Sequence, residues 1–278
     1  MFWSAKQEEK IFKFILWAVA VGTLLILFTI IGHILIHGVG GLNWEFITEE
    51  PRRMGKEGGI FSMIVGTLYL MVASLVVATP IGVGAAIFLT EYVKKGRVVQ
   101  VIRFGTESLA AVPSIIFGLF GFVLFVITLG MGWSILSGAL TLAFMILPTI
   151  IRSAEEAIKM VPDSYREGSL ALGVTKWYTI RKVVLPSALP GIATGVILGI
   201  GRAVGETAAV LLTAGSALGL PTSIMDPART LSVHLYILAS EGISMEKAYA
   251  SATVLIIVVI AINFLANRLM ARLVGRAV

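Results

Sequence analysis

The chain has 278 residues, of which 57% are hydrophobic and only 14% are charged, and its mean hydropathy is +0.94. Soluble domains usually carry about 25% charged residues, and a single soluble core could not hide so much apolar surface, which excludes an ordinary soluble protein. The net charge of +6 fits cytoplasmic loops that face anionic lipid, and the lack of Cys excludes disulfides and thiolate metal sites.

Long apolar runs predict an all-α integral membrane protein with about six transmembrane helices. A helical crossing needs roughly 20 consecutive apolar residues, whereas an outer-membrane barrel would show alternating segments of about ten residues. The predicted spans are 14–36, 61–90, 108–129, 133–151, 187–218 and 249–267. The first run is interpreted as an uncleaved helix, because it continues to Ile36, well beyond a signal-peptidase-like AVA sequence at 18–20.

Lysine and arginine are distributed unevenly among the segments that join these spans. Sixteen of the 22 basic residues lie in the predicted cytoplasmic segments 1–13, 91–107, 152–186 and 268–278. Five lie in the outer segments 37–60 and 219–248, and Arg202 lies within a span. Since cytoplasmic loops are enriched in Lys and Arg, this bias predicts that both termini are cytoplasmic.

The longest cytoplasmic loop, 152–186, is expected to form a helix, a turn and a second helix. Pro162 suits the first turn of a helix, and Asp163 in that turn suits the positive end of the helix dipole. Gly173 is a natural C-terminal stop. Thr175 is expected to cap a second short helix that runs to Val184.

The same loop carries a motif with fixed spacing: Glu-Gly-Ser, three residues, Gly, nine residues and Val-Val-Leu-Pro. Its spacing matches the EAA loop of ABC importer permeases, E-A-A-x3-G-x9-I-x-L-P, which it resembles. Small residues on one face let a short helix dock closely in a groove of a partner; the alternative is an ordinary amphipathic surface helix. The ATPase-coupling residues that the resemblance implies are Tyr165, Glu167, Gly168, Ser169, Gly173, Leu185 and Pro186.

The resemblance implies the type I ABC importer permease fold, with the coupling helix seated in a separate nucleotide-binding subunit. The chain contains no G-x-x-x-x-G-K-[ST] run and therefore no P-loop of its own. ATP and Mg are thus expected on partner ATPase subunits, and no cofactor on this chain. No nucleophile constellation or pair of carboxylates suggests an enzyme, and we expect one transmembrane domain over 1–278.

Motifs in the second to fifth spans resemble the phosphate group of these permeases. They are IVGTLY at 64–69, TPIGVGAAI at 79–87, LAAVPSIIFGLFG at 109–121, LPTIIR at 147–152 and GVILGIGRAVGETA at 195–208. Of the two paralogous subunits in that group, PstA is favoured over PstC by LPG at 189–191, DP at 226–227 and LSVH at 231–234. The resemblance implies phosphate import across the plasma or inner membrane, with a PstC-like second permease, two PstB-like ATPase subunits and an extracytoplasmic PstS-like phosphate-binding protein.

Arg202 and Glu206 are four residues apart on the predicted fifth helix. Arg202 is about 18 Å along the axis from Pro190, near mid-bilayer, where a charge costs at least a few kcal/mol unless it faces protein or water. We predict a substrate pathway in which the planar guanidinium of Arg202 binds phosphate oxygens and Glu206 holds Arg202 between transport events. The alternative is a structural ion pair that sets the rotation of the helix.

Two further features leave alternatives open. Arg152, at the end of the fourth predicted span, is either a second cation at the inner exit of the pathway or a snorkelling residue. Gly191, Gly195 and Gly199 recur every four residues. Small residues at this spacing let helices approach closely, either within this subunit or against a neighbouring one.

Other functions also remain open. An importer for another oxyanion, such as sulfate, molybdate or tungstate, differs from a phosphate importer only in the span motifs. A proton- or ion-coupled secondary transporter would need coupling carboxylates within the bilayer, for which Glu206 is the clear candidate. A membrane scaffold would leave Arg202 unexplained. A metal site is not expected, because His33 and His37 without a third ligand are a weak site.

Overall fold

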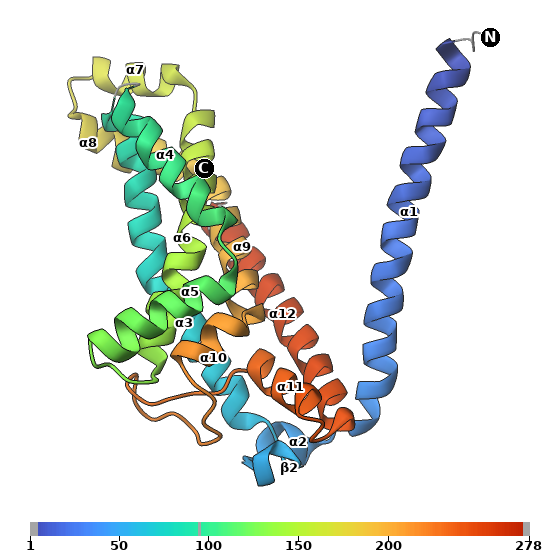
Figure 1. The fold of residues 1–278 in the computed structure, drawn as a ribbon. Coiled ribbons are helices and arrows are strands. Elements are labelled where there is room, and N and C mark those ends of the chain that lie inside the picture. The colour runs from blue at the N-terminus through green and yellow to red at the C-terminus, as the bar shows by residue number, and fades with distance from the viewer. Residues whose placement is uncertain (1–4, 94–95, 275–278) are drawn as a thin grey trace.

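The computed structural model describes residues 5–93 and 96–274, most of which are helical (Figure 1). The helical segments that are long and apolar enough to cross a membrane are Glu8–Gly41, Phe61–Tyr92, Ile135–Met160, Lys176–Gly205 and Met245–Met270. A bent pair, Val99–Ala111 and Ser114–Thr128, supplies a sixth crossing if it counts as one span. The number agrees with the six spans that hydropathy predicts.

The helices follow one another with short connections. They are α1 (Ala5–Gly38), α2 (Trp44–Thr48), α3 (Phe61–Ile87), α4 (Arg97–Ala111), α5 (Ser114–Gly121), α6 (Ile135–Met160), α7 (Asp163–Ala171), α8 (Lys176–Thr179), α9 (Leu185–Gly205), α10 (Ala208–Thr213), α11 (Leu231–Ser240) and α12 (Met245–Val274). Strands β1 (Pro51–Arg52) and β2 (Glu57–Gly58) pair antiparallel. The 3-10 turns are Val39–Gly41 and Arg53–Gly55, and the wider π-turns are Phe88–Tyr92, Phe122–Thr128 and Ile180–Val184.

Helix α6 lies at the centre of the bundle and packs between α3 and α9. Its Leu142, Ile146 and Ile150 are fully buried. Gly82 lets α3 come close, because a Cβ at this position would lie 2.7 Å from Cγ2 of Ile150. Close packing of small residues supplies the van der Waals contact that holds helices together in lipid, where apolar surface alone gives no driving force.

The glycine stripe of α9 also faces α6. A Cβ on Gly191 would lie 2.5 Å from Cβ of Ala157, and a Cβ on Gly195 would lie 2.5 Å from Cβ of Ser153. At Gly199 the nearest atom is Cδ1 of Ile150, at 3.6 Å. Of the two alternatives that the sequence left open, the stripe therefore packs within this chain.

The third span is bent, and the prediction of an unbroken span at 108–129 is wrong. Helix α4 ends at Ala111, Val112 has an extended backbone (φ −70°, ψ 131°), and α5 leaves at 103° to α4. Pro113 causes the break, because its ring disfavours helical backbone at the preceding residue and it has no N–H to donate. The bend lets α4 lie along α6, where Arg103 contacts Glu155.

The two ends of the molecule differ in what they carry. Figure 1 shows α7, α8 and the start of α1 towards one end, and α2 with the β hairpin at the other. This arrangement agrees with the predicted cytoplasmic end. Helix α1 stands apart from the bundle over most of its length and contacts α12 near its own C-terminal end, where Nε2 of His33 lies 3.3 Å from the hydroxyl of Tyr249.

The outer segment 219–248 is an ordered part of the bundle. It contains α11, whose Leu231 is fully buried. Before α11, the carboxylate of Asp226 accepts hydrogen bonds from the N–H groups of Thr222 and Ser223, each at 2.8 Å. These bonds, with that of Thr222 the strongest influence, hold the pKa of Asp226 below its ordinary value.

Candidate functional site

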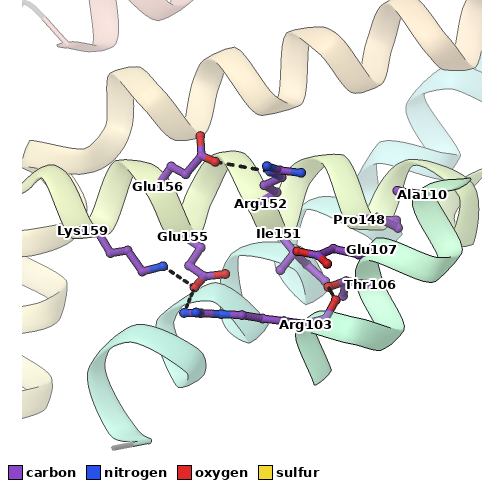
Figure 2. Close-up of a pocket in the computed structure, with 10 residues that line it drawn as sticks. All are labelled: Arg103, Thr106, Glu107, Ala110, Pro148, Ile151, Arg152, Glu155, Glu156 and Lys159. Carbon is purple, nitrogen blue, oxygen red and sulfur yellow. Dashed lines mark hydrogen bonds and ion pairs between the residues drawn. The ribbon is translucent and has the colours of Figure 1, made fainter. Parts of the chain in front are cut away.

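A charged pocket of about 180 Å³ lies between α4 and α6 near the cytoplasmic end (Figure 2). Three basic and three acidic side chains line it, so the charges of its walls balance. The lining residues are Arg103, Thr106, Glu107, Ala110, Pro148, Ile151, Arg152, Glu155, Glu156 and Lys159. The pocket therefore presents cations that carboxylates of the same chain already neutralise.

Glu155 is the centre of the ion pairs in this pocket. Its side chain is 9% exposed, and its Oε1 accepts from Arg103 of α4 and from Nζ of Lys159 at 2.6 Å. Figure 2 shows both cations converging on this carboxylate. Within the described part of the chain, Nε of Arg103 is buried without a hydrogen-bond partner. These contacts fix α4 to α6.

Arg152 lies inside α6, and the predicted end of the fourth span at 151 is wrong, because the helix continues to Met160. Nε of Arg152 donates to Oε1 of Glu156 at 3.3 Å. The two side chains are 75% and 64% exposed. Exposed ion pairs contribute only about 0–1 kcal/mol, so an anion in the pocket can replace Glu156 at small cost.

The fifth span ends at Gly205, and the prediction of a longer span, 187–218, is wrong. Glu206 has an extended backbone (φ −74°, ψ 130°) between α9 and α10. Its Oε1 accepts from the N–H of Ala209 at 3.2 Å, which caps α10. Oγ of Ser232 donates to the backbone oxygen of Glu206 at 2.7 Å and satisfies a carbonyl that the break exposes.

Arg202 is half-buried on α9, one turn before this break. Its predicted ion pair with Glu206 is wrong, because Glu206 lies beyond the end of the helix and its carboxylate is bound to Ala209. Among residues 5–93 and 96–274, no carboxylate lies within ion-pair distance of Arg202. The donors of this guanidinium are therefore not engaged by an acidic side chain in the described chain.

Helix α7 carries the coupling motif at the surface, and none of its residues is buried. Tyr165 is 53% exposed, and Glu167 is exposed as well. A Cβ on Gly168 would meet nothing within 4 Å. Ser169 differs, because its Oγ lies 2.9 Å from Oγ1 of Thr179 and ties α7 to α8. The small residue at 168 is thus not required by packing inside the chain, which leaves its open side for a partner.

The turn after α7 forms as predicted. Gly173 has φ +77°, in the left-handed region that favours glycine. Thr175 caps α8 by accepting a hydrogen bond from the N–H of Tyr178 at 3.3 Å. Pro162, in contrast, immediately precedes the helix and does not lie in its first turn.

The second helix of the loop does not stop at Val184, as predicted, but continues into α9. Leu185 and Pro186 lie inside this continuous segment. The widened turn Ile180–Val184 precedes them, and a wider turn relieves the clash of a proline ring with the preceding turn. The end of the coupling motif is therefore part of the fifth span.

Four charged residues of the pocket were missed as site residues: Arg103, Glu107, Glu155 and Lys159. Glu155 and Lys159 are four residues apart, so helical spacing indicates their pairing. Arg103 is 52 residues from Glu155 in the sequence. No local pattern connects them, because their contact depends on the bend at Pro113.

The comparisons with known proteins agree with the fold. A family model described as "Binding-protein-dependent transport system inner membrane component" matches residues 78–278. The chain is 36% identical over 258 residues to "Probable ABC transporter permease protein YqgI" of Bacillus subtilis, covering 87% of this chain and 88% of that protein. It is 39% identical over 212 residues to "Phosphate transport system permease protein PstA 1" of Mycobacterium tuberculosis, covering 75% and 69%.

A solved structure shares the fold over nearly the whole chain. It is a bacterial alginate ABC transporter in complex with an alginate-bound periplasmic protein. The TM-score is 0.71 at 16% identity, and the match covers 96% of each chain. The shared fold is that of the type I ABC importer permeases. The chain therefore belongs to the binding-protein-dependent transport system inner membrane components, a family of multi-pass membrane permeases.

Proposed function

We propose that this chain forms half of the pathway for inorganic phosphate in an ATP-driven importer. The observation that carries the proposal is Arg202, a half-buried guanidinium on a membrane-spanning helix that forms no ion pair with any described residue. Relatives named as phosphate transport system permease proteins, at 32% to 39% identity, support phosphate as the substrate.

The chemistry of arginine suits this task. Its planar guanidinium offers parallel N–H donors to two oxygens of one phosphate and stays charged at physiological pH. Placing such a cation in a bilayer costs at least a few kcal/mol, so its presence in α9 without an acidic partner favours a role in binding anions. Glu206 then acts by ending α9 and capping α10, which shapes the path beside Arg202.

Arg152 is the proposed second cation, at the cytoplasmic exit. It lines the charged pocket together with Arg103 and Lys159. A phosphate that leaves Arg202 competes with Glu156 for Arg152, and the pair re-forms after release. Because the carboxylates neutralise the cations between transport events, the anion is not trapped.

ATP hydrolysis on two partner nucleotide-binding subunits, which are PstB-like, drives this cycle through α7. Its exposed Tyr165, Glu167 and Gly168 form the docking face. ATP and Mg bind those subunits, and this chain performs no catalysis itself. A PstC-like permease completes the pathway, and a PstS-like extracytoplasmic protein delivers phosphate.

Substitution Arg202→Gln tests the proposal directly. We expect uptake of labelled phosphate to fall by about tenfold or more, because a charge-assisted contact is worth about 1.5–3 kcal/mol, while complex assembly and ATP hydrolysis persist. Arg268→Gln, at an exposed position on α12, is the matched control and should leave uptake unchanged. If Arg202→Gln prevents assembly, or assembles and transports normally, the pathway role is wrong.

The substrate is tested on the unmodified complex. Excess sulfate, molybdate or tungstate should not inhibit uptake of labelled phosphate, whereas excess unlabelled phosphate should. Inhibition by one of the other oxyanions at equal concentration would identify that anion as the substrate. Uptake that continues without ATP but follows an ion gradient would instead indicate a secondary transporter.

A further inference from the structure

One arginine of α7, outside the coupling motif, binds three other parts of the chain. Nε of Arg166 donates to Oε1 of Glu91 at 3.0 Å. Nη1 donates to the backbone oxygen of Val161 at 2.6 Å, and Nη2 to that of Ile158 at 2.9 Å. The whole planar fork of the guanidinium is thus engaged, which fixes its orientation as well as its position.

The burial of this cluster sets it apart from the other ion pairs of the loop. The side chains of Arg166 and Glu91 are 18% and 8% exposed. Arg166 also contacts Asp163 at 3.1 Å, but the Asp163 side chain is 87% exposed. Solvent competes with the Asp163 pair and much less with the Glu91 pair, so Glu91 is the partner that determines the geometry.

The contacts of Arg166 lead to the two central helices. Glu91 lies in the π-turn Phe88–Tyr92 that extends α3. The carbonyls of Ile158 and Val161 are at the C-terminal end of α6, where helices leave acceptors unsatisfied. Helices α3 and α6 form the largest packed pair in the bundle. A displacement of α7 therefore reaches the transmembrane core directly at this point.

Helix α8 holds the same end of α3 from a second position. Nζ of Lys176 donates to the backbone oxygen of Glu91. The ammonium also lies 5.1 Å from the centre of the Tyr92 ring, a cation–π contact. The segment Glu91–Tyr92 is thus clasped from α7 and from α8.

We propose that Arg166 and Glu91 form a rigid coupling link that transmits movement of α7 into α3 and α6. The inference rests on the proposed function, in which partner ATPase subunits move α7. Without the link, α7 is joined to α6 through Val161 and Pro162 alone, and it can rotate about these residues without moving the bundle. Arg166 and Glu91 are positioning residues, because they act on the pathway through the helices.

The test compares variants in the reconstituted complete complex. The measured quantity is the number of phosphate ions imported per ATP hydrolysed. Glu91→Ala removes the buried acceptor, and Arg166→Lys keeps the charge but cannot reach three acceptors at once. Both should lower the ratio by about tenfold, within the 5–150-fold range typical of coupling between sites, while ATP hydrolysis and co-purification of the subunits stay within about twofold of the unmodified complex.

Asp163→Asn is the matched control, because it removes the exposed partner of the same arginine and should leave the ratio unchanged. An unchanged ratio in Arg166→Lys would overturn the inference. So would a parallel loss of assembly, ATP hydrolysis and import, since Arg166 would then only cap α6. If Glu91→Ala does not assemble, Arg166→Lys decides the question. Failure of the phosphate proposal appears separately, as import of another oxyanion by the unmodified complex, and the ratio is then measured with that anion.

Discussion

Three arginines of the site differ in how strongly the chain already binds them. Arg103 is held by Glu155, whose side chain is 9% exposed. Arg152 has an exposed partner in Glu156, and Arg202 has no acidic partner among the described residues. The first contact is structural, because removing a buried carboxylate leaves charges unpaired. The other two guanidinium groups are those that an anion can reach at little cost.

Substitution Glu155→Ala should therefore destabilise the protein. It leaves Arg103 and Lys159 facing each other without their shared carboxylate, at a cost of about 1–3 kcal/mol. Thermal unfolding of the purified chain in detergent would show this as a lower Tm, whereas Glu156→Ala, which breaks an exposed pair, should change stability by about 1 kcal/mol or less. Equal effects of the two substitutions would contradict the role given to Glu155.

Helices of this chain pack closely where glycine faces a neighbour. Gly195 of α9 lies against Ser153 of α6, and Gly201 on the same helix has nothing within 4 Å of a Cβ. The two positions have the same residue type and helical backbone. They differ in the space available, so they separate packing from helix propensity.

We expect Gly195→Ala to destabilise the chain by about 1–3 kcal/mol, because the added methyl group forces α9 away from α6. Gly201→Ala should be neutral or stabilise by up to about 1 kcal/mol, since Ala has the higher helix propensity. The Tm of each variant, measured by intrinsic tryptophan fluorescence, checks this. A more stable Gly195→Ala would show that α6 and α9 do not pack as described.

The elements that a local pattern specifies are those that could be predicted. Spacing and capping residues predicted α7, the turn at Gly173 and the cap at Thr175. The end of α9 could not be predicted, because the apolar run continues past Gly205 and only the side chain of Glu206 and the distant Ser232 stabilise the break. The pocket was missed for the same reason, since Arg103 meets Glu155 through the tertiary fold. The transport roles of Arg152, Arg202 and the coupling residues remain predictions.

At the scale of the whole molecule, the charge bias and the fold agree on orientation. The end that carries α7 and α8 is the one that the basic residues assign to the cytoplasm (Figure 1). The β hairpin and α2 lie at the opposite end. Since the chain contains no Cys, single introduced cysteines report the location of each end without background.

A membrane-impermeant maleimide should label Trp44→Cys in cells with an intact plasma membrane, because Trp44 is 78% exposed in the outer segment. Leu172→Cys, 83% exposed beside the coupling helix, should react only after the cells are permeabilised. Gel detection of the label measures both. Labelling of Leu172→Cys from outside would invert the proposed orientation.

The π-turn between α8 and α9 changes how the fifth span is numbered around its axis. A π-turn accommodates one more residue than an α-turn, and one residue corresponds to about 100° of rotation. A helical wheel drawn without a break from Lys176 to Gly205 would therefore assign one half of the segment to the wrong side. Positions for probes or crosslinks on α9 should be counted from Leu185 onward, so that they share a register with Arg202 and the glycines.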